Sequence, residues 1–82
     1  MMFQYDDEAD ALYVYFRHIE PGGVKDVRTL DDLRNVDYDA AGEPIGVEFL
    51  CVQEGVDLSG VPRAEEIEKL LREFRPAVAL RA

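Results

Sequence analysis

The sequence has few of the residues that carry nucleophilic and metal chemistry. It contains one cysteine, Cys51, one histidine, His18, and no tryptophan in 82 residues. A lone cysteine excludes a disulfide within the chain, and without paired Cys and His spacings there is no zinc motif. Cys51 lies in a short apolar run, where a thiol acts as a small hydrophobe. A small domain without disulfides fits a reducing compartment, so we expect a cytoplasmic protein.

Basic residues are also scarce, and this limits the kinds of partner. Nine Lys and Arg stand against eighteen Asp and Glu, a formal charge of −9. Such a chain is poorly suited to bind phosphate backbones, which requires cationic side chains. The charge either favours a basic protein partner or serves solubility alone. We expect no direct contact with nucleic acid.

Long apolar runs are absent as well. No stretch approaches the roughly 20 apolar residues that cross a bilayer. The first residues, MMFQYDDEADA, lack the basic head and apolar core of a secretion signal. There is also no glycine-rich phosphate loop, so the expected protein is soluble, contacts no membrane and uses no cofactor.

What the first two thirds of the chain does have is a strand pattern with a period of two. In 11–17, Leu12, Val14 and Phe16 point one way, whereas Tyr13, Tyr15 and Arg17 point the other. Turn residues separate this segment from further short strands. The predicted strands are 2–5, 11–17, 24–30, 34–38 and 45–52.

Strand 45–52 has the most informative pair of faces. Ile45, Val47, Phe49 and Cys51 share one face, and Gly46, Glu48, Leu50 and Val52 share the other. The second face becomes apolar toward its end, so this strand is expected to be central. We place Pro44 in the preceding turn, outside the ladder. In strand 24–30, Val27 is the best core candidate.

After Glu54 the period changes to that of a helix. Ile67, Leu70, Leu71 and Phe74 follow the i, i+3, i+4, i+7 spacing of an amphipathic stripe. Pro62 suits the first helical position, and Pro76 ends the pattern. We predict a helix over about 62–75. The apolar tail, 76–82, either frays or pairs at a sheet edge.

These elements predict one small α+β domain over 1–82. An antiparallel sheet of four to five strands in hairpins occupies about 2–52, and one C-terminal amphipathic helix packs on one face. One helix covers one face only, so the face with Tyr13, Tyr15, Leu50 and Val52 stays open unless the tail folds over it. Tyrosine is enriched at interfaces. We expect this face, or an exposed edge, to form a homodimer or dock a partner.

Two motifs resemble the small bacterial family of unknown function called YuzE-like. One is YDDEADALY at 5–13, and the other combines VDYD at 36–39 with GVEFL at 46–50. The resemblance covers about 2–52, and longer members have a similar loop and helix, here 55–74. Asp7 stands where proline is common in the family, which makes the first turn less rigid. The resemblance implies no catalytic residues, and for some members it implies an antitoxin-like role toward small toxins.

Acidic turns are the remaining candidate sites. Asp6, Asp7, Glu8 and Asp10 form one cluster that could hold Mg²⁺ or Ca²⁺, or could bond local backbone N–H groups. The second turn, with Asp37 and Asp39, has the spacing of a calcium loop. However, Ala41 offers no side-chain oxygen, and the flanking segments have strand periodicity. Asp6, Asp10, Asp37 and Asp39 are therefore weak metal candidates.

The expected function is a non-catalytic protein-interaction module, antitoxin-like toward a basic partner in the form that the resemblance implies. Its interaction candidates are Tyr13, Tyr15, Leu50, Val52, Asp6 and Asp7. A small metal-binding protein or hydrolase that uses the acidic turns is the alternative. The sequence leaves the partner, the oligomeric state, the strand order and the role of the tail open.

Overall fold

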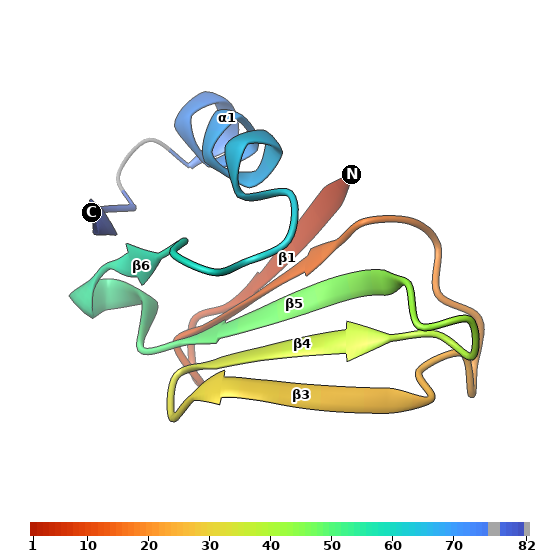
Figure 1. Ribbon diagram of the computed structural model, residues 1–82. Coiled ribbons are helices and arrows are strands. Elements are labelled where there is room, and N and C mark those ends of the chain that lie inside the picture. Colours follow the sequence, from red (N-terminus) through yellow and green to blue (C-terminus); the bar gives the residue numbers. More distant parts are fainter. Residues whose placement is uncertain (76–77, 82) are drawn as a thin grey trace.

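The computed structural model describes residues 1–75 and 78–81 of the chain. Figure 1 shows a sheet with one helix on one side of it. The sheet consists of β1 (Met2–Asp6), β2 (Ala11–Tyr15), β3 (Asp26–Asp31), β4 (Arg34–Tyr38) and β5 (Pro44–Leu50). After it come the 3₁₀ turn η1 (Val52–Glu54), the short strand β6 (Val56–Asp57), the helix α1 (Ala64–Phe74) and β7 (Leu80–Arg81).

The five strands are antiparallel and lie in the order β1-β2-β5-β4-β3. Strand β5 is central, and the hairpins β1–β2 and β3–β4 flank it. The register places Val47 opposite Val14 on one side and opposite Val36 on the other. The α+β prediction, with five strands and one C-terminal helix, is confirmed.

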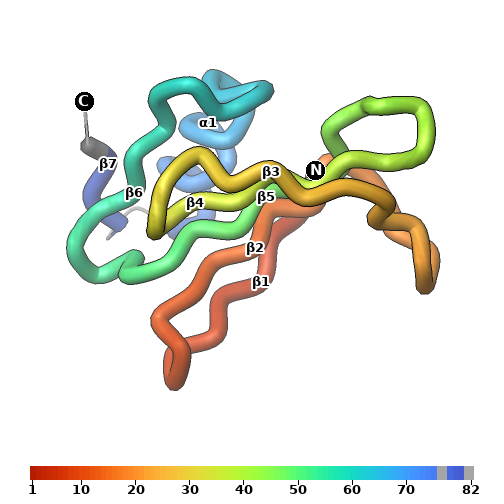
Figure 2. Tube along the Cα trace, turned by 60° about the horizontal axis from the view of Figure 1, so that its bottom comes forward, coloured from red at the N-terminus to blue at the C-terminus, as the bar shows by residue number. Residues whose placement is uncertain are grey.

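The core lies between the sheet and the segment that follows it. Figures 1 and 2 show α1 and β6 on the same side of the sheet. From the helix, Ile67 and Leu71 are fully buried in this layer. The sheet contributes the predicted faces, because Leu12, Val14, Phe16, Ile45, Val47 and Phe49 are all buried.

Arg34 ties the β3–β4 hairpin to the loop after β6. Its guanidinium bonds Asp31 Oδ2 at 2.9 Å and also donates to the carbonyl oxygens of Asp57 (3.1 Å) and Ser59. Only 11 % of the Arg34 side chain is exposed. The hydrogen bond from Arg34 lowers the pKa of Asp31. Buried charges need such partners, so the pairing fixes where the loop crosses the sheet.

Helix α1 is shorter than the predicted 62–75. Its N-cap is Arg63, in the left-handed region at φ 56°, so Pro62 lies before the helix and not at its first position. Phe74 was expected in the buried stripe, but it is 59 % exposed because the helix ends there, beyond the sheet. The helix therefore packs through Ile67 and Leu71, with Leu70 partly buried.

Two predictions about the strands are wrong. Val27 is 54 % exposed, because β3 is an edge strand and Val27 pairs with Asp37 on the side away from the helix. Pro44 is the first residue of β5, where it pairs with Tyr38 next to a register shift. The first residue of a strand is one of the few ladder positions that proline tolerates.

Strand β5 ends before the predicted 45–52 segment does. Cys51 has φ 53°, in the left-handed region, so the alternation of faces stops at Leu50. The chain then turns Val52 into the core, where it is 4 % exposed, whereas Cys51 is half-buried outside the strand. Burial raises the pKa of the Cys51 thiol. Val52 is therefore not part of the open face.

The tail lies on the helix side of the sheet in its described part, 78–81. Strand β7 pairs in parallel with β6, and Val78 and Leu80 pack against the core. Of the two predicted alternatives, pairing is the one observed, although the partner is β6 and not the main sheet. Residues 76, 77 and 82 lie outside the described residues.

Candidate interaction surface

The face of the sheet opposite α1, here the outer face, carries a row of polar and aromatic side chains. Within residues 1–75 and 78–81, no helix or strand covers it (Figure 2). Cross-strand pairs place its members side by side, with Gln4 next to Tyr13, Tyr13 next to Glu48, and Glu48 next to Asn35. The outer face consists of Met2, Gln4, Asp6, Ala11, Tyr13, Tyr15, Val27, Thr29, Asn35, Asp37, Gly46, Glu48 and Leu50.

Tyr13 bridges three strands of this face. From β2 its ring crosses β5 and its hydroxyl donates to Asp37 Oδ2 of β4 at 2.5 Å. The ring passes over Gly46, where an added Cβ would lie 2.2 Å from the Tyr13 hydroxyl oxygen. Because only glycine leaves this space, Gly46 allows Tyr13 to lie flat on the sheet. Burial and the bond to Asp37 together raise the pKa of the Tyr13 phenol.

Tyr15 extends this aromatic row. The rings of Tyr13 and Tyr15 meet edge to face with centroids 4.7 Å apart, a favoured geometry for aromatic pairs. The Tyr15 hydroxyl donates to Gln4 Oε1 of β1 at 2.7 Å. Both predicted tyrosines thus lie on the outer face, with ring orientations that the sheet itself fixes.

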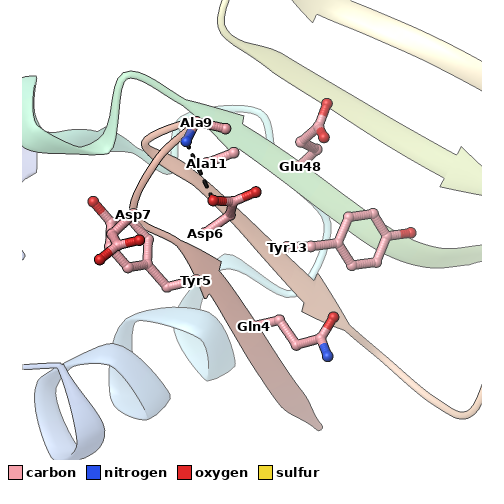
Figure 3. Close-up of a pocket in the computed structure, with 8 residues that line it drawn as sticks. All are labelled: Gln4, Tyr5, Asp6, Asp7, Ala9, Ala11, Tyr13 and Glu48. Carbon is pink, nitrogen blue, oxygen red and sulfur yellow. Dashed lines mark hydrogen bonds between the residues drawn. The ribbon is translucent and has the colours of Figure 1, made fainter.

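An acid hollow opens at the β1–β2 end of the outer face. Figure 3 shows the residues that line it, with Asp6 at the end of β1, Asp7 in the turn that follows and Glu48 on β5. The acid hollow is lined by Gln4, Tyr5, Asp6, Asp7, Ala9, Ala11, Tyr13 and Glu48. The Tyr13 ring and three carboxylates therefore border one concave surface, whereas the Tyr5 ring lies on the helix side of the sheet with the Arg75 guanidinium 4.4 Å from its centroid.

A second hollow lies at the other end of the outer face. It shares Tyr13 with the acid hollow and has a more apolar lining, formed by Met2, Tyr13, Tyr15, Arg17, His18, Ile19 and Val24. Arg17 at its rim is paired with Asp39 at 2.6 Å, and His18 lies 3.2 Å from Glu20. The outer face thus carries carboxylates at one end and, at the other, the Arg17 guanidinium paired with Asp39.

The acids proposed as metal ligands in the first turn have structural partners. Asp6 Oδ1 accepts the backbone N–H groups of Glu8 and Ala9 at 3.0 and 3.2 Å. Asp10 accepts the Tyr5 hydroxyl at 2.7 Å and the Gln53 N–H at 3.0 Å. The bond to Asp10 raises the pKa of the Tyr5 phenol. Asp10 therefore joins the first hairpin to η1.

Asp37 and Asp39, the second pair of proposed metal ligands, also have structural partners, and these differ between the two. Asp37 accepts the Tyr13 hydroxyl on the outer face. Asp39 closes the β4–β5 turn, where it accepts the N–H groups of Ala41 and Glu43, each at 2.9 Å. These backbone bonds, and the Arg17 pair, lower the pKa of Asp39. In the described part of the chain, no group of three or more His, Cys, Asp or Glu is arranged to hold a metal ion.

The structure brings together most, but not all, of the predicted interaction residues. Asp6, Asp7 and Tyr13 border the acid hollow, and Leu50 lies on the same face opposite Ala11. Glu48 was missed as a site residue, although the strand alternation already placed it on the face of Gly46 and Leu50. Gln4 was missed because strand 2–5 gave no clear alternation.

The fold and the surface define a small α+β protein that presents one open, partly acidic sheet face. The family model described as "Protein of unknown function (DUF2283)" matches residues 2–52, more than half of the chain, so the chain belongs to this family. The match covers β1 to β5 and ends where η1 begins. No curated protein and no solved structure matches significantly. Among the described residues, no helix is long and apolar enough to cross a membrane.

Replacing Gly46 with Ala should displace the Tyr13 ring and weaken the fold. We expect a loss of about 1–3 kcal/mol in the free energy of unfolding, as overpacking usually costs. The Tyr13 pKa, raised above its ordinary 10.0 in the parent, should fall in G46A. Because the pKa is raised in the folded state, the contribution of protonated Tyr13 to the free energy of unfolding is complete below pH 10.0 and is lost as the pH rises further. The free energies of unfolding of the parent and G46A should therefore converge at alkaline pH.

Tyr13→Ala provides the matched background for this test. Without the ring, G46A should cost little or even stabilise, because Ala restricts the unfolded chain. Chemical denaturation of the four proteins and ultraviolet titration of the phenols measure both effects. An equal cost of G46A with and without the Tyr13 ring would contradict the packing described here.

Proposed function

We propose that this protein is a non-catalytic interaction module whose outer face binds a basic segment of a partner protein. The observation that carries the proposal is the acid hollow, where Asp6, Asp7 and Glu48 border the same concave surface as Tyr13. Carboxylates form charge-assisted hydrogen bonds with Arg or Lys, and aromatic faces attract the same cations. The two kinds of group together suit a cationic side chain.

The fixed orientation of the Tyr13 and Tyr15 rings supports this proposal. Tyr13 and Tyr15 are already held by bonds to Asp37 and Gln4, so docking on them would require little further ordering. Preordered contact groups lower the entropic cost of association. The formal charge of −9 would also speed the encounter with a basic partner.

The resemblance to YuzE-like proteins gives the proposal a more specific form. In that form the basic partner is a small toxin, and this chain is its antitoxin-like inhibitor. The acid hollow supports this version only through its charge, which suits any basic protein surface of matching shape.

A metal-binding or hydrolytic role for the acidic turns is the second candidate. It rests on the number of carboxylates in the two turns. Against it, Asp6, Asp10, Asp37 and Asp39 already accept hydrogen bonds from other parts of the chain. A metal ion would have to compete with these bonds, so we favour the interaction module.

The acid hollow predicts a specific loss of affinity for a cationic probe. A short oligoarginine peptide is titrated into the protein at physiological salt while amide chemical shifts are followed. We expect shifts around Gln4, Asp7 and Glu48. The double variant D7K/E48K should bind about tenfold more weakly, the sum expected for reversing one exposed and one half-buried charge. Asp6 and Asp10 are left unchanged because they stabilise turns.

The control variant is E65K/E73K, which changes the net charge equally on the exposed side of α1. It should bind the peptide almost as the parent does. If both variants lose affinity alike, or if the shifts map to α1, the peptide responds only to net charge and the acid hollow is not the site.

Addition of Ca²⁺, Mg²⁺ or Mn²⁺ should leave the thermal unfolding midpoint unchanged. A ligand at about 100 times its dissociation constant would add about 2.7 kcal/mol to the stability of the folded state. Differential scanning fluorimetry at millimolar metal measures this directly. A metal-dependent rise that disappears in D37N or D39N would favour the second candidate instead.

A further inference from the structure

Strand β3 forms an open edge of the sheet. It is the last strand in the order β1-β2-β5-β4-β3, and all six of its residues are exposed. Figure 1 shows it at the margin of the sheet, on the far side from β1. Such an edge presents unpaired N–H and C=O groups to any other strand. What distinguishes β3 is the pattern of side chains along it.

The ladder determines which backbone groups of β3 face outward. The Leu50 N–H donates to the Leu33 carbonyl at 2.8 Å, so these residues face each other across β4 and β5. Along a strand, the N–H and C=O groups of successive residues point to alternate edges. Those of Val36 therefore point away from β5, toward Arg28 of β3. By the same alternation, the N–H and C=O of Val27 point to the open edge.

The side chains beside Val27 have opposite charges. Asp26 and Arg28 flank it on the face toward the helix, with 57 % and 65 % of their side chains exposed. Within the chain they are 3.3 Å apart. Val27 is itself 54 % exposed. An acid, an apolar residue and a base thus follow one another along an edge with available backbone groups.

We propose that β3 pairs antiparallel with β3 of a second copy, with Val27 on the two-fold axis. In this register Asp26 lies opposite Arg28 of the second copy, and Arg28 lies opposite its Asp26. The two Val27 side chains then lie opposite each other, and each is 54 % exposed in the single chain. Opposite charges and apolar pairs directly across a ladder stabilise it; the Asp26–Arg28 pair occurs twice by symmetry, and the Val27 pair lies once on the axis.

The charges also exclude the neighbouring registers. Two β3 strands can hydrogen-bond only through residues whose N–H and C=O groups point to the open edge. The register between them can therefore slip only in steps of two residues. One such shift places Arg28 opposite Arg28, and the shift in the other direction places Asp26 opposite Asp26. Like charges directly across a ladder are destabilising. The sequence around Val27 therefore favours one register and disfavours both alternatives.

This dimer would join two five-stranded sheets edge to edge and would leave both outer faces open. The inference is therefore independent of the proposed function, because the acid hollow lies at the β1–β2 end of the sheet. A protein could dimerise without binding a basic partner, or the reverse.

Charge exchange tests the dimer. The molar mass of the parent is measured by light scattering and sedimentation from about 1 μM to about 1 mM. We expect a monomer–dimer equilibrium in the parent and monomers for D26R and for R28D alone. An equimolar mixture of D26R and R28D should recover the dimer, because every opposite pair is then complementary. The mixture also controls for folding, since a misfolded variant could not restore association.

Two further variants make the result unambiguous. V27P removes an N–H that faces the open edge, not β4, and should be a folded monomer. E65R carries the same charge change as D26R on α1 and should dimerise as the parent does. A parent that stays monomeric, single variants that still dimerise, or a mixture that stays monomeric would each overturn the proposal.

Discussion

The structure depends on the central position of β5, because both hairpins of the sheet pair with this strand and not with each other. On the core side, Val47 lies between Val14 and Val36, and all three are fully buried. On the other side, Gly46 lies beneath the ring of Tyr13, which reaches from β2 to Asp37 on β4. One strand is therefore fixed from both faces, by aliphatic packing on one and by a hydrogen-bonded aromatic bridge on the other. The helix needs to cover only the first face.

Because the two faces of the sheet are stabilised in different ways, they also differ chemically. The core side is closed by Ile67 and Leu71, with Arg34 fastening the intervening loop. The outer face keeps polar and aromatic groups whose bonds run between strands. Most of the acidic residues in the turns that border it act on the backbone, as Asp39 does in the β4–β5 turn. Asp7 and Glu48, which border the open hollow beside Tyr13, are what remains for a partner.

The sequence predicted the sheet because its alternation is strong where both neighbours are strands, as for Leu12, Val14 and Phe49. It failed where the chain leaves that geometry. The left-handed conformation of Cys51 has no signature in an apolar run, so Val52 was assigned to the wrong face. Val27 was misplaced because alternation gives the two faces of a strand but does not say which face is covered, nor that β3 is an edge. The bridge from Tyr13 to Asp37 depends on strand order, which one sequence does not reveal.

Native-state amide hydrogen exchange tests the central role of β5 most directly, since exchange reports the stability of each strand separately. The amides of Val47 and of Val14, which pair across β5 and β2, should exchange only through global unfolding. At low protein concentration the amide of Val27 should exchange orders of magnitude faster. If β5 amides exchange as fast as those of β3, or open before the flanking hairpins do, β5 is not the strand that holds the fold together.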